Sequence, residues 1–285
     1  ITKGEVVGFL GPNGAGKTTT MRVLTCFLPQ SEGVVEVAGF DNKKDSINIR
    51  RNIGYLPENA PVYTDMLVIE YLDFLTQIRK ITGFQKLKRL NEIINICSLE
   101  KVVYRPIGQL SKGFKQRVGI AQSIIHNPDI LILDEPTSGL DPNQIVEIRE
   151  LIKKLGQEKT VILSTHILQE VQAMCNRVVI INEGKIVADG KAEELVKFSK
   201  GETIIHSIIK GPKDEIVNKL KMFSEVREIN VEYLGENTNR FNIAIATEND
   251  ISEDIFGLAV SNNWRLKELY KEKISLEDIF RQLTT

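Results

Sequence analysis

The stretch Gly11-Pro12-Asn13-Gly14-Ala15-Gly16-Lys17-Thr18 has the spacing of a phosphate-binding loop. The apolar run 6–10 before it predicts a buried strand, and 18–27 after it predicts a helix. Glycines let successive backbone N–H groups turn towards an anion, and the helix N-terminus adds its positive dipole end. Lys17 is then expected at the β- and γ-phosphates of a nucleotide, and Thr18 at Mg²⁺. The flanking strand and helix favour a nucleoside triphosphate site over the alternative, a structural glycine turn.

A second stretch, Ile130-Leu131-Ile132-Leu133-Asp134-Glu135, is an apolar run that ends in two acids. Such a run is typical of a strand buried on both faces of a parallel sheet, and ligands of these sheets bind at the carboxyl ends of the strands. We expect Asp134 to hold Mg²⁺ through water and Glu135 to act as the general base towards an attacking water. The alternative is a solvated acidic turn, which the proline at 136 and the adjacent acids disfavour.

Three further segments follow the phosphate loop: Leu110-Ser111-Lys112-Gly113-Phe114-Lys115-Gln116-Arg117, Ser138-Gly139-Leu140-Asp141 and Ser164-Thr165-His166. With these segments the chain resembles the ATP-binding cassette (ABC) family, whose markers all occur here in the family's order. The resemblance extends from Ile1 to about Phe198. It implies an α/β P-loop NTPase fold at 1–198, with a mostly parallel sheet core, an antiparallel β subdomain and a helical subdomain at about 58–127.

By this resemblance, 110–115 is the family signature, which caps the γ-phosphate held by the other subunit of a head-to-tail dimer. Ser111 is also a good N-cap for a helix that starts at Lys112, so its hydroxyl and the free N–H groups predict a second anion site. We therefore expect a homodimer, or a heterodimer with a similar ATPase. The residues expected to contact ATP are Asn13, Gly14, Ala15, Gly16, Lys17, Thr18, Thr19, Ser111, Gly113 and Asp141.

A histidine such as His166 is usually a packed or surface residue. The resemblance instead makes His166 the switch residue that bonds the γ-phosphate, so it joins Glu135 as a catalytic residue. His126 and His206 have no such context, and we expect them to be ordinary residues.

The chain departs from the family pattern at three positions. Lys112 replaces a signature glycine, which reduces backbone freedom but adds a cation near the expected anion site. Phe114 replaces the usual glutamine, and Glu58 stands where the family has the glutamine that touches Mg²⁺. A carboxylate can ligate Mg²⁺. The expected metal ligands are therefore Thr18, Glu58 and Asp134, with Glu58 as a simple loop acid the alternative. These variants resemble a bacterial subgroup that serves polytopic exporters, including gliding-motility-associated ATPases.

Residues 199–285 follow a different pattern. Strands are predicted at 203–210, 226–234, 241–246 and 264–270, and helices at 212–222 and 248–262. This β-α-β-β-α-β order is that of a small α+β ferredoxin-like domain. A last amphipathic helix is predicted after Ser275. Because no catalytic cluster occurs here, we expect an accessory or dimerisation domain.

The N-terminus and one short polar motif do not fit the family pattern. The sequence opens at Ile1 without Met and without the upstream strand pair and adenine-stacking aromatic of the family, so we expect a truncated N-terminus and assign no base-stacking residue. Asn42-Lys43-Lys44-Asp45 matches the guanine-reading pattern of GTPases. It follows the phosphate loop too closely and has no buried strand before it, so we interpret it as a chance match.

Composition agrees with a cytoplasmic ATPase. The 285 residues carry a net charge of −1, which gives no electrostatic case for nucleic acid as a partner. Cys26, Cys97 and Cys175 are scattered without ligand spacing and are expected to be reduced thiols. No apolar run approaches the roughly 18 residues of a membrane span. The predicted function is to bind and hydrolyse ATP and drive a polytopic membrane permease, from the inner face of the cell membrane.

Two alternative functions remain at the level of sequence. The first is a soluble cassette ATPase that acts on DNA or ribosomes, although the chain has neither long heptad coils nor a second cassette. The second is a regulatory module that binds ATP with little turnover, because Glu58 and Phe114 are unusual.

Replacing Lys17 with Ala should abolish ATP binding, because the substitution removes the cation in the loop that is aimed at the β- and γ-phosphates. Titration with a fluorescent ATP analogue measures the effect. Micromolar affinity retained in a folded Lys17→Ala protein would contradict the assignment of the loop.

Overall fold

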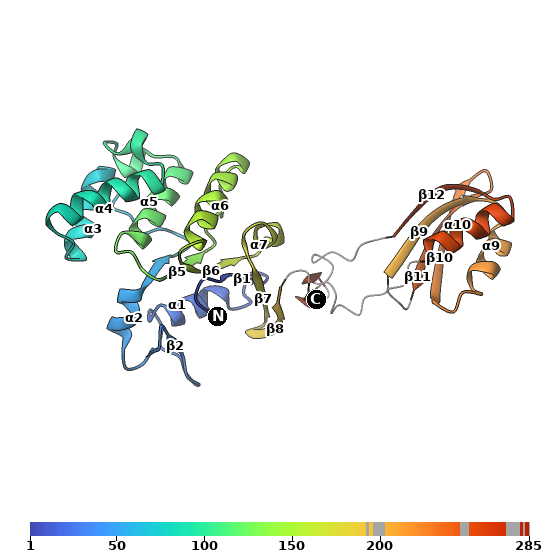
Figure 1. Ribbon diagram of the computed structural model, residues 1–285, viewed down its shortest axis with the longest axis horizontal. Helices are drawn as coiled ribbons and strands as arrows, with labels where there is room; N and C mark the ends of the chain where they lie inside the picture. The colour runs from blue at the N-terminus through green and yellow to red at the C-terminus, as the bar shows by residue number, and fades with distance from the viewer. Residues whose placement is uncertain (192–193, 196–202, 246–250, 272–279, 282, 285) are drawn as a thin grey trace. The chain divides into compact units, whose positions relative to one another are not determined.

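The computed structural model describes residues 1–191, 194–195, 203–245, 251–271, 280–281 and 283–284. The chain forms two compact units (Figure 1): one contains Ile1–Leu195 with Phe280–Thr285, and the other contains Val196–Ile279. Residues 280–285, predicted to belong to the C-terminal domain, thus group with the first unit. There the side-chain amide of Asn182 donates to the carbonyl oxygen of Leu283 at 3.3 Å.

A six-stranded sheet forms the centre of the first unit. Its order is β4-β5-β6-β1-β7-β8, and all neighbours are parallel except β7 and β8, which are antiparallel. The strands are β1 (Val6–Leu10), β4 (Ile53–Leu56), β5 (Ile130–Asp134), β6 (Thr160–Thr165), β7 (Arg177–Asn182) and β8 (Lys185–Gly190). Strands β1 and β6 are buried along their whole length, as expected of strands covered on both faces. The predicted parallel core is confirmed.

The strand register brings the carboxyl ends of the central strands together. Leu10 at the end of β1 stands opposite Thr165 at the end of β6, and Asp134 at the end of β5 stands opposite Ser164. The segments that leave these strands therefore start at the same edge of the sheet. The side chains that come directly after β1, β4, β5 and β6 can therefore meet at this edge.

Strand β4 was not predicted from the sequence. Its four residues follow helix α2 (Ser46–Asn52) directly and are too few to show a strand period. Gly54 lets the strand approach α5, since a Cβ there would lie 2.1 Å from the carbonyl oxygen of Ser123. The strand carries the chain to Glu58 at the edge of the sheet.

Helices follow the core strands. The helix after the phosphate loop, α1 (Lys17–Leu24), is three residues shorter at its end than predicted. Cys26 has a left-handed backbone with φ of 56°, and the N–H groups of Phe27 and Leu28 both donate to the carbonyl of Arg22. After β5 comes α6 (Pro142–Gly156), and after β6 comes α7 (Leu168–Met174).

The predicted helical subdomain contains α3 (Val68–Ile78), α4 (Gly83–Ile96) and α5 (Lys112–Ile124), which lie together in Figure 1. Tyr71 of α3 is 2% exposed, and its hydroxyl donates to the side-chain oxygen of Gln122 in α5 at 2.6 Å. The antiparallel β part is small among the described residues: β2 (Glu36–Val37) pairs with β3 (Phe40–Asp41), and β7 pairs with β8.

The second unit has the predicted β-α-β-β-α-β order. Its elements are β9 (Thr203–Lys210), α9 (Lys213–Leu220), β10 (Val226–Gly235), β11 (Thr238–Ile245), α10 (Ser252–Ser261) and β12 (Arg265–Lys271). The sheet order is β10-β11-β9-β12 with antiparallel neighbours. Ile216 and Leu220 of α9 and Ile255 of α10 share one core with Phe241, so both helices cover the same face of the sheet. The predicted last helix begins at residues outside those described.

Membrane insertion was not expected for this chain. Within the part of the chain that the structure describes, no helix has the length and apolar character needed to cross a bilayer.

The stability of the first unit should depend on pH through His126. Its Nε2 donates to the carbonyl oxygen of Ile53 at 2.9 Å. Burial, and then the charge of Arg79 with smaller effects of Arg89 and Lys159, lower the pKa of His126 from 6.5 to about 4. Between these two values the unfolded chain binds more protons than the folded chain, so stability falls as pH drops from about 6.5 towards 4.

Urea unfolding at several pH values between 7.5 and 4.5 tests this dependence. The loss assigned to His126 is on the order of 2 kcal/mol. His126→Gln keeps a donor for Ile53 but does not titrate, so its stability should fall less steeply over the same pH range. Equal slopes for the two proteins would contradict the prediction.

Candidate nucleotide-binding site

The loop 11–16 has the backbone that a phosphate cradle requires. Gly14 and Gly16 have φ of 82° and 103°, conformations that side chains rarely adopt. Gly11 lies so close to β7 that a Cβ there would be 2.4 Å from the carbonyl oxygen of Ile181. The Lys17 side chain curls back over the loop, and its Nζ donates to the carbonyls of Gly11 and Pro12 at 2.9 and 3.1 Å. This cation is 6% exposed.

Glu135 lies opposite this lysine because the chain turns sharply after β5. Its φ is 48°, an uncommon value for a residue with a side chain. The turn is held by Ser164 of the neighbouring strand, whose carbonyl and hydroxyl oxygens both accept from the Glu135 N–H at 3.1 Å. The local strain at Glu135 is therefore balanced by two hydrogen bonds to β6.

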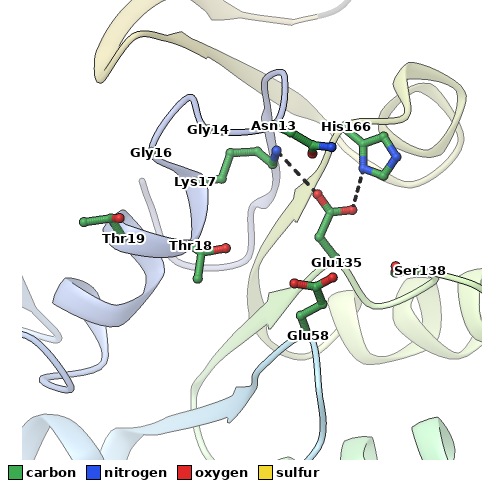
Figure 2. A pocket seen from close by; sticks show the side chains of 10 residues that line it. All are labelled: Asn13, Gly14, Gly16, Lys17, Thr18, Thr19, Glu58, Glu135, Ser138 and His166. Carbon is green, nitrogen blue, oxygen red and sulfur yellow. Dashed lines mark hydrogen bonds and ion pairs between the residues drawn. The ribbon is translucent and has the colours of Figure 1, made fainter.

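Figure 2 shows the Glu135 carboxylate between Lys17 and His166. Oε1 lies 3.5 Å from Lys17 Nζ, and Oε2 lies 2.9 Å from His166 Nδ1. Glu135 is 8% exposed, whereas the His166 side chain is 44% exposed. The structure thus brings both predicted catalytic residues into direct contact, with the cation of the phosphate loop on the opposite side of the carboxylate.

Oxygen atoms that suit Mg²⁺ lie beside this group. Thr18 Oγ1 is 3.3 Å from Asp134 Oδ1, which also accepts from the hydroxyl of Ser164. Asp134 is 1% exposed. Mg²⁺ prefers such oxygen ligands and usually keeps several waters and substrate phosphates in its shell. Among the described residues, no group of three or more His, Cys, Asp or Glu side chains is placed to hold a metal ion.

These side chains line a cavity of about 290 Å³. Its lining consists of Asn13, Gly14, Gly16, Lys17, Thr18, Thr19, Glu58, Glu135, Ser138 and His166. Every one of these except Ser138 was predicted as a site residue. The signal for Ser138 was its position only three residues after Glu135, and its N–H donates to the Glu135 carbonyl at 3.1 Å. Glu58 reaches the cavity from the end of β4.

Five predicted residues do not line the cavity: Ala15, Ser111, Gly113, Asp134 and Asp141. Ala15 is 3% exposed, and its N–H closes the phosphate loop onto Pro12 at 3.2 Å. Asp141 is the N-cap of α6, where its Oδ1 accepts from the N–H of Gln144 at 3.0 Å. Asp134 lies behind Thr18, as described above.

The expected Ser111 cap is confirmed. The Ser111 hydroxyl accepts from the N–H of Phe114 at 3.4 Å, and α5 begins at Lys112. Lys112 does not need the positive φ that a glycine would allow. Its ammonium group lies over Gly139, where a Cβ would be 2.1 Å from Nζ. No residue of the signature segment, 110–115, lines the cavity formed by the same chain's phosphate loop.

None of the residues of the guanine-reading pattern, 42–45, lines the cavity. Asn42 is 5% exposed, and its side-chain amide donates to the carbonyl of Val23. The chance-match interpretation agrees with this contact.

Tyr55 of β4 lies in the electrostatic field of the site. Burial, followed by the negative charge of Asp134, raises the pKa of Tyr55.

The parallel sheet, the phosphate loop and the acidic end of β5 together define a P-loop nucleoside triphosphatase. A family model described as "ABC transporter" matches residues 1–138. The linearmycin resistance ATP-binding protein LnrL of Bacillus subtilis is 30% identical over 285 residues, which is all of this chain and 91% of the relative. The bacitracin transport ATP-binding protein BcrA of Bacillus licheniformis is 40% identical over 70% of this chain and 65% of its own length.

Solved structures agree with these relatives. The ATP-binding cassette MJ0796, in a dimeric post-hydrolysis state bound to ADP and Pi, superimposes with a TM-score of 0.60 at 30% identity. The match covers 67% of this chain and 87% of that one. The chain belongs to the ABC transporter family, and it is an ATP-binding, ATP-hydrolysing subunit of that family. The predicted fold of the cassette and its predicted activity are confirmed.

Replacing Ser164 with Ala should lower ATP turnover about tenfold while leaving ATP affinity within about threefold. The hydroxyl donates to Asp134 and accepts from the Glu135 N–H, so its loss loosens both acids. Steady-state ATPase assays and a nucleotide titration measure the two effects.

Ser123→Ala is the matched control, because Ser123 is also buried but donates only within α5, to the carbonyl of Ile120. Turnover that falls equally in both variants would show a general loss of packing and contradict the role of Ser164.

Proposed function

We propose that two copies of this chain, or one copy and a similar ATPase, close around two ATP molecules, and that hydrolysis drives a separate membrane permease. The observation that carries the proposal is the Glu135 carboxylate, held between Lys17 and His166 in a cavity lined by the phosphate loop. The dimeric states of the cassette MJ0796 support the assembly.

The chain's own residues would perform hydrolysis as follows. The loop N–H groups and Lys17 bind the β- and γ-phosphates and balance their charge. Glu135 accepts a proton from the water that attacks the γ-phosphorus, and the bond to the β–γ bridging oxygen breaks to give ADP and phosphate. Because Nδ1 of His166 contacts Glu135, Nε2 is the ring nitrogen left to contact the γ-phosphate.

Mg²⁺ fits the oxygen atoms of Thr18 and Asp134, and Glu58 would add a carboxylate from the segment that follows β4. When bound, the ion would neutralise charge on the β- and γ-phosphates. Thr18 would contribute its hydroxyl, and Asp134, which is oriented by Ser164, would hold a metal-bound water.

The signature segment would complete the site of the other copy. Ser111 caps the N-terminus of a 13-residue helix that starts outside its own chain's cavity. The helix N–H groups and the Ser111 hydroxyl would bind the γ-phosphate held by the partner. Gly113 and Asp141 would lie at the same interface. ATP would then join the two chains, and loss of phosphate would release them.

A polytopic permease would be the membrane partner, with the ATPase bound at the inner face of the membrane. The segment between Glu58 and α3 supports this assignment. Tyr63 is 59% exposed, and its ring packs edge-on against Tyr71 and Phe74 with centroids 5.9 and 5.7 Å apart. Such a rigid, exposed aromatic suits a docking helix. The names of LnrL and BcrA, a resistance and a bacitracin transport protein, favour export.

ATP turnover measured with and without a co-expressed permease tests the link to transport. Stimulation by the permease supports the proposal, and turnover that the permease leaves unchanged counts against it.

The dimer is tested with Glu135→Gln. The amide keeps the shape of the carboxylate but cannot accept the proton, so hydrolysis should fall about 100-fold or more. The substitution also removes a negative charge that faces the phosphates, which favours the closed pair. Light scattering with Mg²⁺-free ATP should then report a dimer, and light scattering with ADP should report a monomer.

Glu147→Gln serves as the control, because Glu147 is exposed on α6 and pairs with Arg117 away from the cavity. A Glu135→Gln protein that binds ATP yet remains monomeric would rule out the composite site.

A further inference from the structure

A buried carboxylate beneath the cavity is unused by the mechanism above. Glu170, in the first turn of α7, has no exposed surface. Its Oε1 accepts from the hydroxyl of Thr137, and its Oε2 accepts from the hydroxyl of Thr165 at 2.7 Å. Nη2 of Arg149 in α6 lies 3.9 Å from Oε1, which is too long for a hydrogen bond. The carboxylate is thus held mainly by two hydroxyl groups.

The two threonines stand at the base of the two catalytic segments. Thr137 follows Glu135 by two residues, and Thr165 immediately precedes His166. Thr137 is 2% exposed and Thr165 is fully buried. Glu170 therefore ties together the two segments whose side chains meet at the contact between Glu135 and His166.

Thr165 also orients the neighbouring backbone. Its hydroxyl accepts from the N–H of Ile167 at 3.0 Å, which leaves the hydroxyl proton for Glu170. Its carbonyl accepts from the N–H of Gly11 at 3.4 Å, at the start of the phosphate loop. The orientation that Glu170 imposes on Thr165 is thus transmitted to both His166 and the loop.

A side chain of α5 also holds the segment after β5 by a hydrogen bond. The side-chain amide of Gln116 in α5 donates to the carbonyl of Pro136 at 2.8 Å. Glu170 holds the next residue, Thr137. Because both side chains are buried, the path of the chain from Glu135 to Ser138 is fixed by hydrogen bonds rather than by apolar packing alone.

An ionised carboxylate in the interior is costly to bury unless its oxygens are satisfied. An apolar residue would fill the same volume without that cost, so packing does not account for a carboxylate at 170. What a carboxylate alone provides here is two strong acceptors that face two different segments.

We propose that Glu170 is a positioning residue for ATP hydrolysis: it holds Thr137 and Thr165, and through them sets the distance between Glu135 and His166. The inference rests on the proposed roles of Glu135 and His166. Glu170 does not line the cavity, so its removal should change the rate of the chemical step more than the affinity for ATP.

The test compares Glu170→Gln with Thr137→Val and Thr165→Val. An amide presents one acceptor oxygen instead of two, so at least one threonine hydroxyl loses the acceptor for its proton. Each substitution should lower kcat about tenfold or more, with the Kd for ATP changed less than about threefold, as expected for misplaced catalytic groups. Thr137→Ser and Thr165→Ser keep the hydroxyl and should restore kcat to within about threefold of the parent protein.

Glu150→Gln is the matched control, since Glu150 is exposed on α6 and pairs only with Lys153 among the described residues. Thermal unfolding identifies any variant that fails to fold, and the two valine variants then stand in for Glu170→Gln. The proposal is overturned if the folded Glu170→Gln protein keeps kcat within about twofold of the parent. It is also overturned if the serine variants lose as much activity as the valine variants.

Glu135→Gln is measured in parallel, so that a failure of the proposed catalytic function can be told apart from a failure of the role proposed for Glu170. If Glu135→Gln hydrolyses ATP at the parental rate, the proposed catalytic function fails. If Glu135→Gln is inactive while Glu170→Gln is fully active, the role of Glu170 alone is wrong.

Discussion

The pairing of β5 with β6 is the constraint on which the rest of the site depends. It places Asp134 opposite Ser164, and the same serine accepts from the Glu135 N–H after the strand has ended. A left-handed residue with a side chain is unfavourable, and these hydrogen bonds hold it in place. A shift of one residue in this register would move the side chains of Asp134 and Glu135 each to the other face of the sheet. Both carboxylates would then be separated from the phosphate loop.

Much of the cassette could be predicted because its elements carry strong local signals. The bounds of β1 match the prediction, and α5 begins at Lys112 as its serine cap indicated. The phosphate loop and the acidic end of β5 identified seven of the ten residues that line the cavity, and the family resemblance added Glu58 and His166. These patterns are local, since each depends on neighbours in sequence and not on contacts across the fold.

The features that escaped prediction depend on contacts between distant segments. Strand β4 is defined by its pairing with β5 and by the close approach of Gly54 to α5, and four residues show no period of their own. Glu170 lies in a short helix and looks like an ordinary polar residue in sequence. Its importance follows from Thr137, 33 positions away, and from the complete burial of its side chain. Tertiary contacts of this kind are not encoded in a local pattern.

The departure at Lys112 is explained by the segment that follows β5. Gly139 leaves room for the Lys112 side chain, and Gly113 in turn leaves room for Gln144, whose side chain lies 2.5 Å from where a Cβ would stand. Each segment thus has a glycine where the other has a long side chain. This reciprocal packing joins the Ser111 cap to the segment that contains Ser138 and Asp141. The two sides of the proposed composite site, one lining the chain's own cavity and one presented to a partner, are therefore coupled within a single chain.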